Sequence, residues 1–157
     1  MALAVGQKAP DFTLVDTERK PRSLAEFKGK NLILAFYPSA FTGVCTKEMC
    51  TFRDSVGDLG AVGGAVLGIS ADSPFANKVF AEKNQINFPL LSDYTRTVIS
   101  SYDIQLPNFA GLTGYTAAKR AVFVLDKEGT IRYMWVSDDP TKEPNYEEVK
   151  QAIQKIQ

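Results

Sequence analysis

The sequence predicts an α/β fold in which a central mixed sheet is flanked by helices. Two observations favour it: strand-length apolar runs alternate with segments of helical composition, and one run is apolar almost throughout. Of the 157 residues, 45% are hydrophobic and 23% charged, which is typical of a globular chain. We therefore expect a single domain over residues 1–157.

The N-terminal part is expected to form two short strands, a short helix and one long strand. Residues 11–15 alternate enough for a short strand, and the polar turn at 16–20 leads to a second. The SLAE motif at 23–26 fits a capping box, which opens a brief helix that Gly29 ends. Residues 31–37 (NLILAFY) are predicted to be a central strand that is buried on both faces.

A proline separates this strand from the next helix. Pro38 ends the strand because proline has no N–H to donate to a sheet. A loop over residues 39–44 follows, and helical composition runs from Cys45 to the glycines near residue 60. Residues 65–70 (AVLGIS) are predicted to be a second buried strand.

The next segment is expected to contain two helices around a short strand. Ser73 and Pro74 are a typical N-cap and first helical residue, and they open a helix that ends near Asn84. Residues 88–91 are predicted to be a strand and residues 95–102 a helix.

The C-terminal part is expected to close the fold with a hairpin and a helix. A loop with glycines and aromatic residues covers 103–118. The sequence DKEG separates the predicted strands 121–125 and 130–136, and 146–156 is predicted to be an amphipathic helix. The resulting order β-α-β-α-β-β-α is that of a thioredoxin-like core with additional N-terminal elements.

Composition argues against several classes of function. The 18 Lys and Arg balance the 18 Asp and Glu, which argues against a nucleic acid or an anionic membrane as partner. The chain has no histidine, so histidine metal sites, catalytic triads and histidine bases are excluded. Two cysteines alone cannot close a zinc site. We expect neither a metal nor another cofactor.

The sequence also predicts a cytoplasmic location. No apolar run approaches the ~20 residues that span a bilayer. The start of the chain, MALAVGQKAPDF, lacks the basic region of a signal peptide. The two cysteines are too few for a disulfide framework, and in a reducing compartment such a pair is more often redox-active.

Cys45 is a candidate nucleophile because of its position. It follows a strand that ends at a proline and a short loop, and it lies at the predicted start of a helix. Free backbone N–H groups and the positive end of the helix dipole stabilise an anion there, which favours the reactive thiolate. Position alone leaves a small buried apolar side chain as an equal alternative.

The residues around Cys45 resemble the active site of the peroxiredoxin family. The sequence PSAFTGVC at 38–45 matches the family motif Pro-x-x-x-Thr-x-x-Cys at all three defining positions. Other segments follow in family order over essentially the whole chain: Gly6–Phe12, the strand before Pro38, Phe88–Asp93, Arg120–Asp126 and Gly129. The resemblance implies a thioredoxin-like fold and peroxidase activity.

The resemblance also implies roles for the site residues. Cys45 would attack a peroxide oxygen while the Thr42 hydroxyl and the N–H groups of residues 44 and 45 hold the peroxide. Arg120 would favour the thiolate and stabilise the developing oxyanion. Pro38 would shield the sulfur from water. Taken alone, Thr42 reads as an ordinary loop hydroxyl.

Glu48 and Cys50 have implied roles on the predicted helix. Glu48 matches a family position at which a carboxylate orients the arginine; taken alone it reads as part of a solvated helix face. Thr46 follows Cys45 where many members have proline, and no C-terminal cysteine is present. Thr46 and the Cys-x4-Cys spacing to Cys50 resemble the bacterioferritin-comigratory branch, and the missing C-terminal cysteine excludes the typical two-cysteine arrangement. Cys50 would then resolve the sulfenic acid as a Cys45–Cys50 disulfide.

The resemblance implies a thiol-dependent peroxidase that reduces hydrogen peroxide and organic hydroperoxides and is recycled by a thioredoxin or glutaredoxin-like reductant. Alternatives are an inert Cys50 with an external thiol as reductant, and a non-catalytic interaction protein on the same fold. The protein is expected to be a monomer or homodimer. Phe41 and residues 106–115 could line an apolar approach, form a dimer contact or simply pack.

Overall fold

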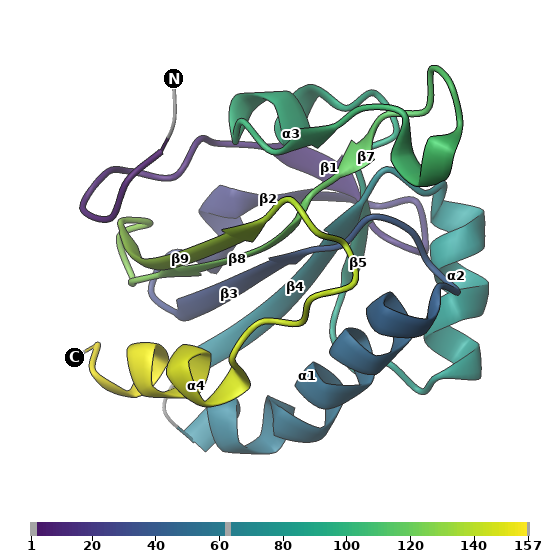
Figure 1. Ribbon diagram of the computed structural model, residues 1–157. Coiled ribbons are helices and arrows are strands. Elements are labelled where there is room, and N and C mark those ends of the chain that lie inside the picture. Colours follow the sequence, from purple (N-terminus) through teal and green to yellow (C-terminus); the bar gives the residue numbers. More distant parts are fainter. Residues whose placement is uncertain (1–2, 62–63, 157) are drawn as a thin grey trace.

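A seven-stranded sheet organises the molecule. The structure is a computed structural model that describes residues 3–61 and 64–156. The sheet order is β2-β1-β5-β4-β3-β8-β9 (Figure 1). Its strands are β1 (Thr13–Val15), β2 (Pro21–Ser23), β3 (Asn31–Phe36), β4 (Gly64–Ser70), β5 (Leu90–Ser92), β8 (Arg120–Leu125) and β9 (Ile131–Ser137). The helices are α1 (Gly43–Ala61), α2 (Pro74–Lys83), α3 (Thr97–Ser101) and α4 (Tyr146–Gln154).

The sheet is mixed, as predicted. β3 pairs in parallel with β4 and antiparallel with β8, and β4 pairs in parallel with β5. β8 and β9 form the predicted antiparallel hairpin. β1 joins the other edge, antiparallel to both β2 and β5.

β3 is the central strand because both of its faces are apolar. Every residue of the strand is buried. Leu32, Leu34 and Phe36 lie in one hydrophobic core, whereas Ile33, Ala35 and the following Tyr37 lie in a second core on the opposite face. A nearly continuous apolar run therefore gives a strand that is covered on both sides.

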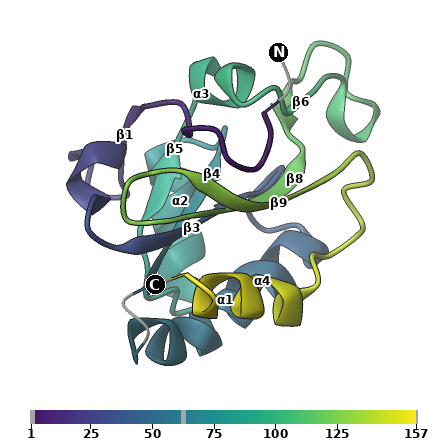
Figure 2. The ribbon, with the colours of Figure 1, turned by 90° about the vertical axis from the view of Figure 1, so that its left-hand side faces the viewer.

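The two cores are covered by different helices. α1, α2 and α4 contribute Met49, Phe80 and Ile153 to one core. α3 and the N-terminal segment contribute Ile99 and Phe12 to the other. Figure 2 shows α1 and α4 on one side of the sheet and α3 on the opposite side. In the described part of the chain, no helix combines the length and the apolar character needed to cross a membrane.

Two segments differ in detail from the prediction. The helix after Ser23 is a 3-10 turn, η1 (Leu24–Phe27), in which the Glu26 side chain accepts a hydrogen bond from the Ser23 N–H. The predicted loop over 103–118 contains a second, two-stranded sheet of β6 (Gln105–Leu106) and β7 (Ala117–Ala118), with the 3-10 turn η2 (Phe109–Gly111) between them. Two-residue strands are too short to show a periodicity in the sequence.

Candidate active site

The loop between β3 and α1 is fastened at both ends. The Tyr37 N–H donates to the Ile69 carbonyl at 3.0 Å, and the Ala40 N–H donates to Asp72 Oδ2 at 2.8 Å. The Thr46 N–H donates to the Thr42 carbonyl at 2.9 Å, which is the first bond of the helix. The backbone therefore leaves the sheet and enters α1 in a fixed direction.

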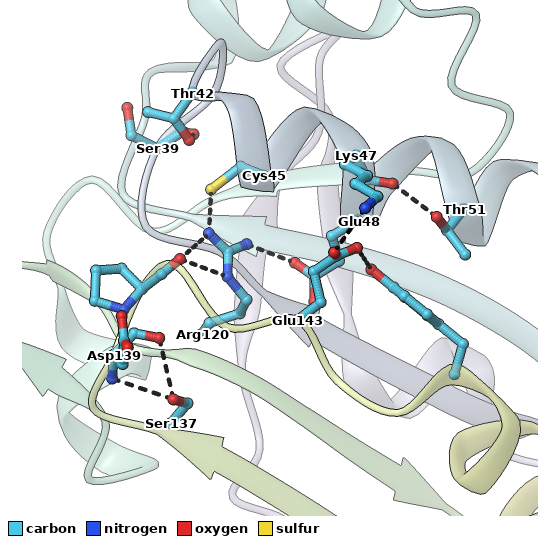
Figure 3. Close-up of polar contacts among 12 residues, drawn as sticks. Ser39, Thr42, Cys45, Lys47, Glu48, Thr51, Arg120, Ser137, Asp139 and Glu143 are labelled. Carbon is cyan, nitrogen blue, oxygen red and sulfur yellow. Dashed lines mark hydrogen bonds and ion pairs between the residues drawn. The ribbon is translucent and has the colours of Figure 1, made fainter.

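Cys45 lies in the first turn of α1 and is completely buried. N–H groups in the first turn of a helix have no partner within that helix, so they are available to an anion or a ligand. The Arg120 guanidinium approaches the sulfur from β8, and its Nη2 lies 3.0 Å from Cys45 Sγ (Figure 3). The sulfur therefore lies next to both the start of a helix and a buried cation.

Arg120 is held in place by three partners and is only 1% exposed. In addition to the contact of Nη2 with Cys45, Arg120 Nη1 donates to Glu48 Oε1 at 2.9 Å. Its Nε and Nη2 donate to the Pro140 carbonyl at 3.1 and 2.8 Å. Burial disfavours its charge, but Glu48 and Cys45 raise the pKa of Arg120 above its ordinary value. The planar group is thus fixed in one orientation as a permanent cation.

Glu48 is buried with this arginine. It lies three residues after Cys45, which places both side chains on one face of the helix. The carboxyl is 0% exposed, and Oε2 has no hydrogen-bond partner among the described residues. Burial raises the pKa of Glu48 to about 8, although Arg120 acts to lower it. The alternative of a solvated helix face, which Glu48 taken alone allowed, does not hold.

Thr42 is half-buried beside the first turn of α1. Its hydroxyl donates to the Ser39 carbonyl at 3.0 Å. The hydroxyl oxygen keeps its capacity to accept a hydrogen bond while its proton is used in this way. Pro38 is buried directly before this loop.

Comparison with known proteins assigns the chain to a family. The AhpC/TSA family model matches residues 5–134. This chain belongs to the AhpC/TSA family. A Coxiella burnetii protein whose name places it among the peroxiredoxins of the bcp type is 43% identical over 135 residues, which cover 86% of this chain and 89% of that protein.

Two further comparisons agree. A chloroplastic peroxiredoxin Q of Populus jackii is 39% identical over 83% of this chain, and the match spans 59% of that longer protein. The crystal structure of peroxidoxin BcpB from Mycobacterium tuberculosis superimposes with a TM-score of 0.80 and 31% identity, covering 95% of this chain and 93% of that one. The chain is a peroxiredoxin of the bacterioferritin-comigratory type, and so a thiol peroxidase with a thioredoxin-like fold.

Cys50 lies apart from Cys45 in this peroxiredoxin. Both cysteines are free, and both belong to the uninterrupted helix α1. Residues five apart on an ideal helix point about 140° away from each other, with Cα atoms about 8.6 Å apart. Cys50 is half-buried on the side towards α2, with Sγ 3.9 Å from Asn84 Oδ1. A disulfide, which tolerates about 7 Å between Cα atoms, cannot form in this conformation.

Sequence reasoning missed the segment that follows β9. The Pro140 carbonyl accepts two hydrogen bonds from Arg120, and Glu143 forms an ion pair with Lys47 at 3.1 Å on the first turns of α1. The Tyr146 hydroxyl donates to Glu143 at 2.7 Å. Partial burial acts to raise the pKa of Glu143, but the contacts with Tyr146 and Lys47 lower it below its ordinary value. No sequence signal marks a backbone carbonyl as a ligand of an arginine.

Proposed function

We propose that Cys45 is the nucleophile with which this peroxiredoxin reduces hydrogen peroxide and organic hydroperoxides. The observation that carries the proposal is the 3.0 Å contact between Arg120 Nη2 and Cys45 Sγ, which are both buried at the start of α1. A thiolate is the reactive form of cysteine, and a fixed cation beside it stabilises that form.

The peroxide step forms one bond and breaks one. The Cys45 thiolate attacks the outer peroxide oxygen, an S–O bond forms as the O–O bond breaks, and the other oxygen leaves as hydroxide or alkoxide that takes up a proton. Arg120 stabilises the developing negative charge. The Thr42 hydroxyl oxygen and the N–H groups of residues 44 and 45 position the peroxide.

Pro38 and Glu48 support these groups. Pro38 is buried at the end of β3, where it shields the sulfur from bulk water. Glu48 accepts a hydrogen bond from Arg120 Nη1 and thereby orients the guanidinium plane.

Cys50 resolves the sulfenic acid of Cys45 in this proposal. Its thiol displaces water from the sulfenic acid and forms the Cys45–Cys50 disulfide, which a thioredoxin or glutaredoxin-like protein then reduces. Because the two residues cannot bond within an intact helix, the first turns of α1 must unwind. The side chain of Cys50 faces Asn84, which favours a second possibility: an external thiol reduces Cys45 directly.

The remaining parts of the proposal concern the whole protein. We expect one domain over residues 1–157 that acts as a monomer or homodimer, without nucleic acid, membrane or cofactor. A cytoplasmic location stays a prediction, because the relatives include chloroplastic proteins.

Peroxide consumption with dithiothreitol as reductant tests the function. The wild type is expected to consume peroxide and Cys45→Ser to lose this activity. Mass spectrometry of the treated wild type distinguishes an intramolecular disulfide from a sulfenic acid and so tests Cys50. An active Cys45→Ser variant contradicts the nucleophile, and an active enzyme that never forms the disulfide favours the external thiol.

A further inference from the structure

One buried cation, Arg120, forms hydrogen bonds with two acidic side chains at the site. Arg120 donates to Cys45 Sγ through Nη2 and to Glu48 Oε1 through Nη1. All three side chains are at most 1% exposed. If Cys45 were a thiolate and Glu48 a carboxylate, two buried negative charges would share a single positive charge. Burying an uncompensated charge is costly, so the pair is expected to keep one proton between them.

Among the described residues, Arg120 is the only cation that forms an ion pair with Glu48. Arg120 faces it from β8, and Glu143, whose charge disfavours the carboxylate form, faces it from the segment before α4. Tyr146 on α4 and Tyr37 after β3 also interact with it, and burial raises the pKa of both phenols, so both are neutral. Lys47 on α1 is 71% exposed and is held by Glu143.

We propose that Glu48 is the proton reservoir of the peroxide step: its carboxyl is protonated while Cys45 is a thiolate, and it releases this proton when the sulfur becomes an uncharged sulfenic acid. The inference rests on the proposed function of Cys45.

The step balances in atoms and charge. A Glu48 carboxylic acid, a Cys45 thiolate and a hydroperoxide become a Glu48 carboxylate, a Cys45 sulfenic acid and an alcohol, or water if the substrate is hydrogen peroxide. The leaving oxygen gains, in net terms, the proton that Glu48 loses. The negative charge moves from one side of Arg120 to the other, so the site contains one cation and one anion before and after the reaction.

Two features of Glu48 support this assignment. Its Oε2 has no hydrogen-bond partner in the described part of the chain. A buried carboxylate that is permanently charged is expected to accept hydrogen bonds at both oxygens. Burial also raises the pKa of Glu48 to about 8, which favours the protonated carboxyl. Glu48 therefore has a second role beyond orienting Arg120.

Proton stoichiometry tests the proposal. Reduced protein with Cys50→Ser, in which the sulfenic acid is the end state, is mixed with one equivalent of hydrogen peroxide in weakly buffered indicator solution. At about pH 7 we expect no net proton uptake, because Glu48 supplies the proton; well above about pH 8, uptake should rise to about one per peroxide. With Glu48→Gln added, about one proton should be taken up at both pH values, and Glu48→Asp should restore the parent behaviour. Glu128→Gln, at an exposed acid in the turn between β8 and β9, should leave the parent stoichiometry unchanged.

Two spectra of the parent protein locate the proton, and Glu48→Gln serves only to assign the carboxyl band. Ultraviolet absorbance should show a thiolate in the reduced protein at about pH 7, which places the proton on Glu48 rather than on sulfur. The infrared difference spectrum on oxidation should show loss of a protonated-carboxyl band. This loss should be absent from Glu48→Gln.

Several outcomes would overturn the proposal. These are uptake of one proton by the parent at about pH 7, no uptake by Glu48→Gln at that pH, or a reduced parent without thiolate absorbance. No uptake by Glu48→Gln would mean that the oxidised sulfur is a negatively charged sulfenate. A reduced parent without thiolate absorbance would mean that the shared proton is on the Cys45 sulfur. A parent that consumes no peroxide contradicts the proposed function instead, so the two failures are distinguishable.

Discussion

Arg120 is the side chain that connects most parts of the site. It joins the sulfur of Cys45 to the carboxyl of Glu48 and to the Pro140 carbonyl. The planar guanidinium makes four hydrogen bonds to these three acceptors, whereas an ammonium group has only three N–H donors. The charge of Arg120 and its shape are therefore separable contributions.

Replacing Arg120 with lysine tests the contribution of shape. Arg120→Lys keeps the charge but loses the planar fork, so we expect the second-order rate with peroxide to fall by roughly 10²- to 10³-fold, as when a fixed donor to a developing oxyanion is removed. Stopped-flow kinetics with the reduced protein measure it. Arg132→Lys is the matched control because Arg132 is 56% exposed and pairs with Asp126. A wild-type rate in Arg120→Lys would show that Arg120 contributes only its charge to the peroxide step.

Thr42 offers a test of the peroxide position. Thr42→Val keeps the shape of the side chain but removes the hydroxyl, so the peroxide rate should fall by roughly 2- to 10-fold through loss of a hydrogen bond to the peroxide. Stability should fall by only about 1 kcal/mol, for the lost bond to Ser39. Peroxide kinetics and urea unfolding separate the two effects. Thr42→Ser should recover most of the rate, and a full rate in Thr42→Val would contradict the assigned role.

The sequence predicted the residues of the site that belong to a local motif and missed those that tertiary packing supplies. Cys45 and Glu48 follow from a short stretch of chain, and the structure brings both to Arg120. Pro140 acts through its backbone carbonyl, so its side chain carries no signal. Glu143 pairs with Lys47 from the segment before α4, whose Tyr146 packs against Phe52 of α1.

At the level of elements, predictability followed length and periodicity. β3 and the β8–β9 hairpin were predicted within about one residue because their apolar patterns are long. The N-cap of α2 was also predicted, and Ser73 Oγ accepts the Ala76 N–H at 3.1 Å. The position of β8 beside β3 was not predicted, because strand order depends on contacts between distant residues.

α1 must adopt two conformations if Cys50 resolves the sulfenic acid of Cys45. The folded first turns bury Cys45 for the peroxide step, whereas the disulfide needs them to open. Opening exposes Met49, which is 0% exposed, and breaks the contacts of Cys45 and Glu48 with Arg120. The stability of these turns therefore sets how long the sulfenic acid persists and how readily excess peroxide oxidises it further.

A more stable α1 should slow resolution. Thr51 is half-buried, and its hydroxyl donates to the Lys47 carbonyl at 2.8 Å, a bond that competes with the helix. Thr51→Ala raises helix propensity by about 0.5 kcal/mol, so disulfide formation should slow by roughly twofold and over-oxidation should rise. Val79→Ala, on the exposed face of α2, is the matched control.

Hydrogen exchange provides the direct measurement. Amide protection across residues 43–53 is compared between reduced and peroxide-treated protein, with over-oxidation followed by mass spectrometry. Treated protein should lose protection there as the disulfide forms. A Cys45–Cys50 disulfide with unchanged protection would contradict opening of the helix.

At the level of the whole molecule, a glycine in the sheet determines how closely the layers approach. Gly68 of β4 is buried beneath α1. A Cβ atom there would lie 2.6 Å from Leu90 Cδ2 and 3.3 Å from both Met49 Sδ and Tyr37 Cε1. These three neighbours belong to β5, to α1 and to the chain that leaves β3. Gly68 therefore lets helix and sheet meet next to the active site.

A methyl group at this position should be costly. Gly68→Ala forces Leu90 and Met49 to shift, and we expect it to destabilise the protein by about 1–3 kcal/mol. Denaturant unfolding measures the change. Gly43→Ala is the control, since a Cβ there meets nothing within 4 Å. Equal stabilities of the two variants would show that the layers adapt freely.

The bond between the Ala40 N–H and Asp72 has a consequence for competition between thiols. This bond fixes the chain just before Phe41, on the N-terminal side of both cysteines. On their C-terminal side, Phe52 is 3% exposed and packs against Tyr146. An opened segment is thus a short loop tethered at both ends, and short flexible tethers give effective concentrations on the order of millimolar. If Cys50 is the resolving cysteine, we expect it to react with the sulfenic acid faster than small thiols present below that concentration. The protein would then present a disulfide, rather than a sulfenic acid, to its reductant.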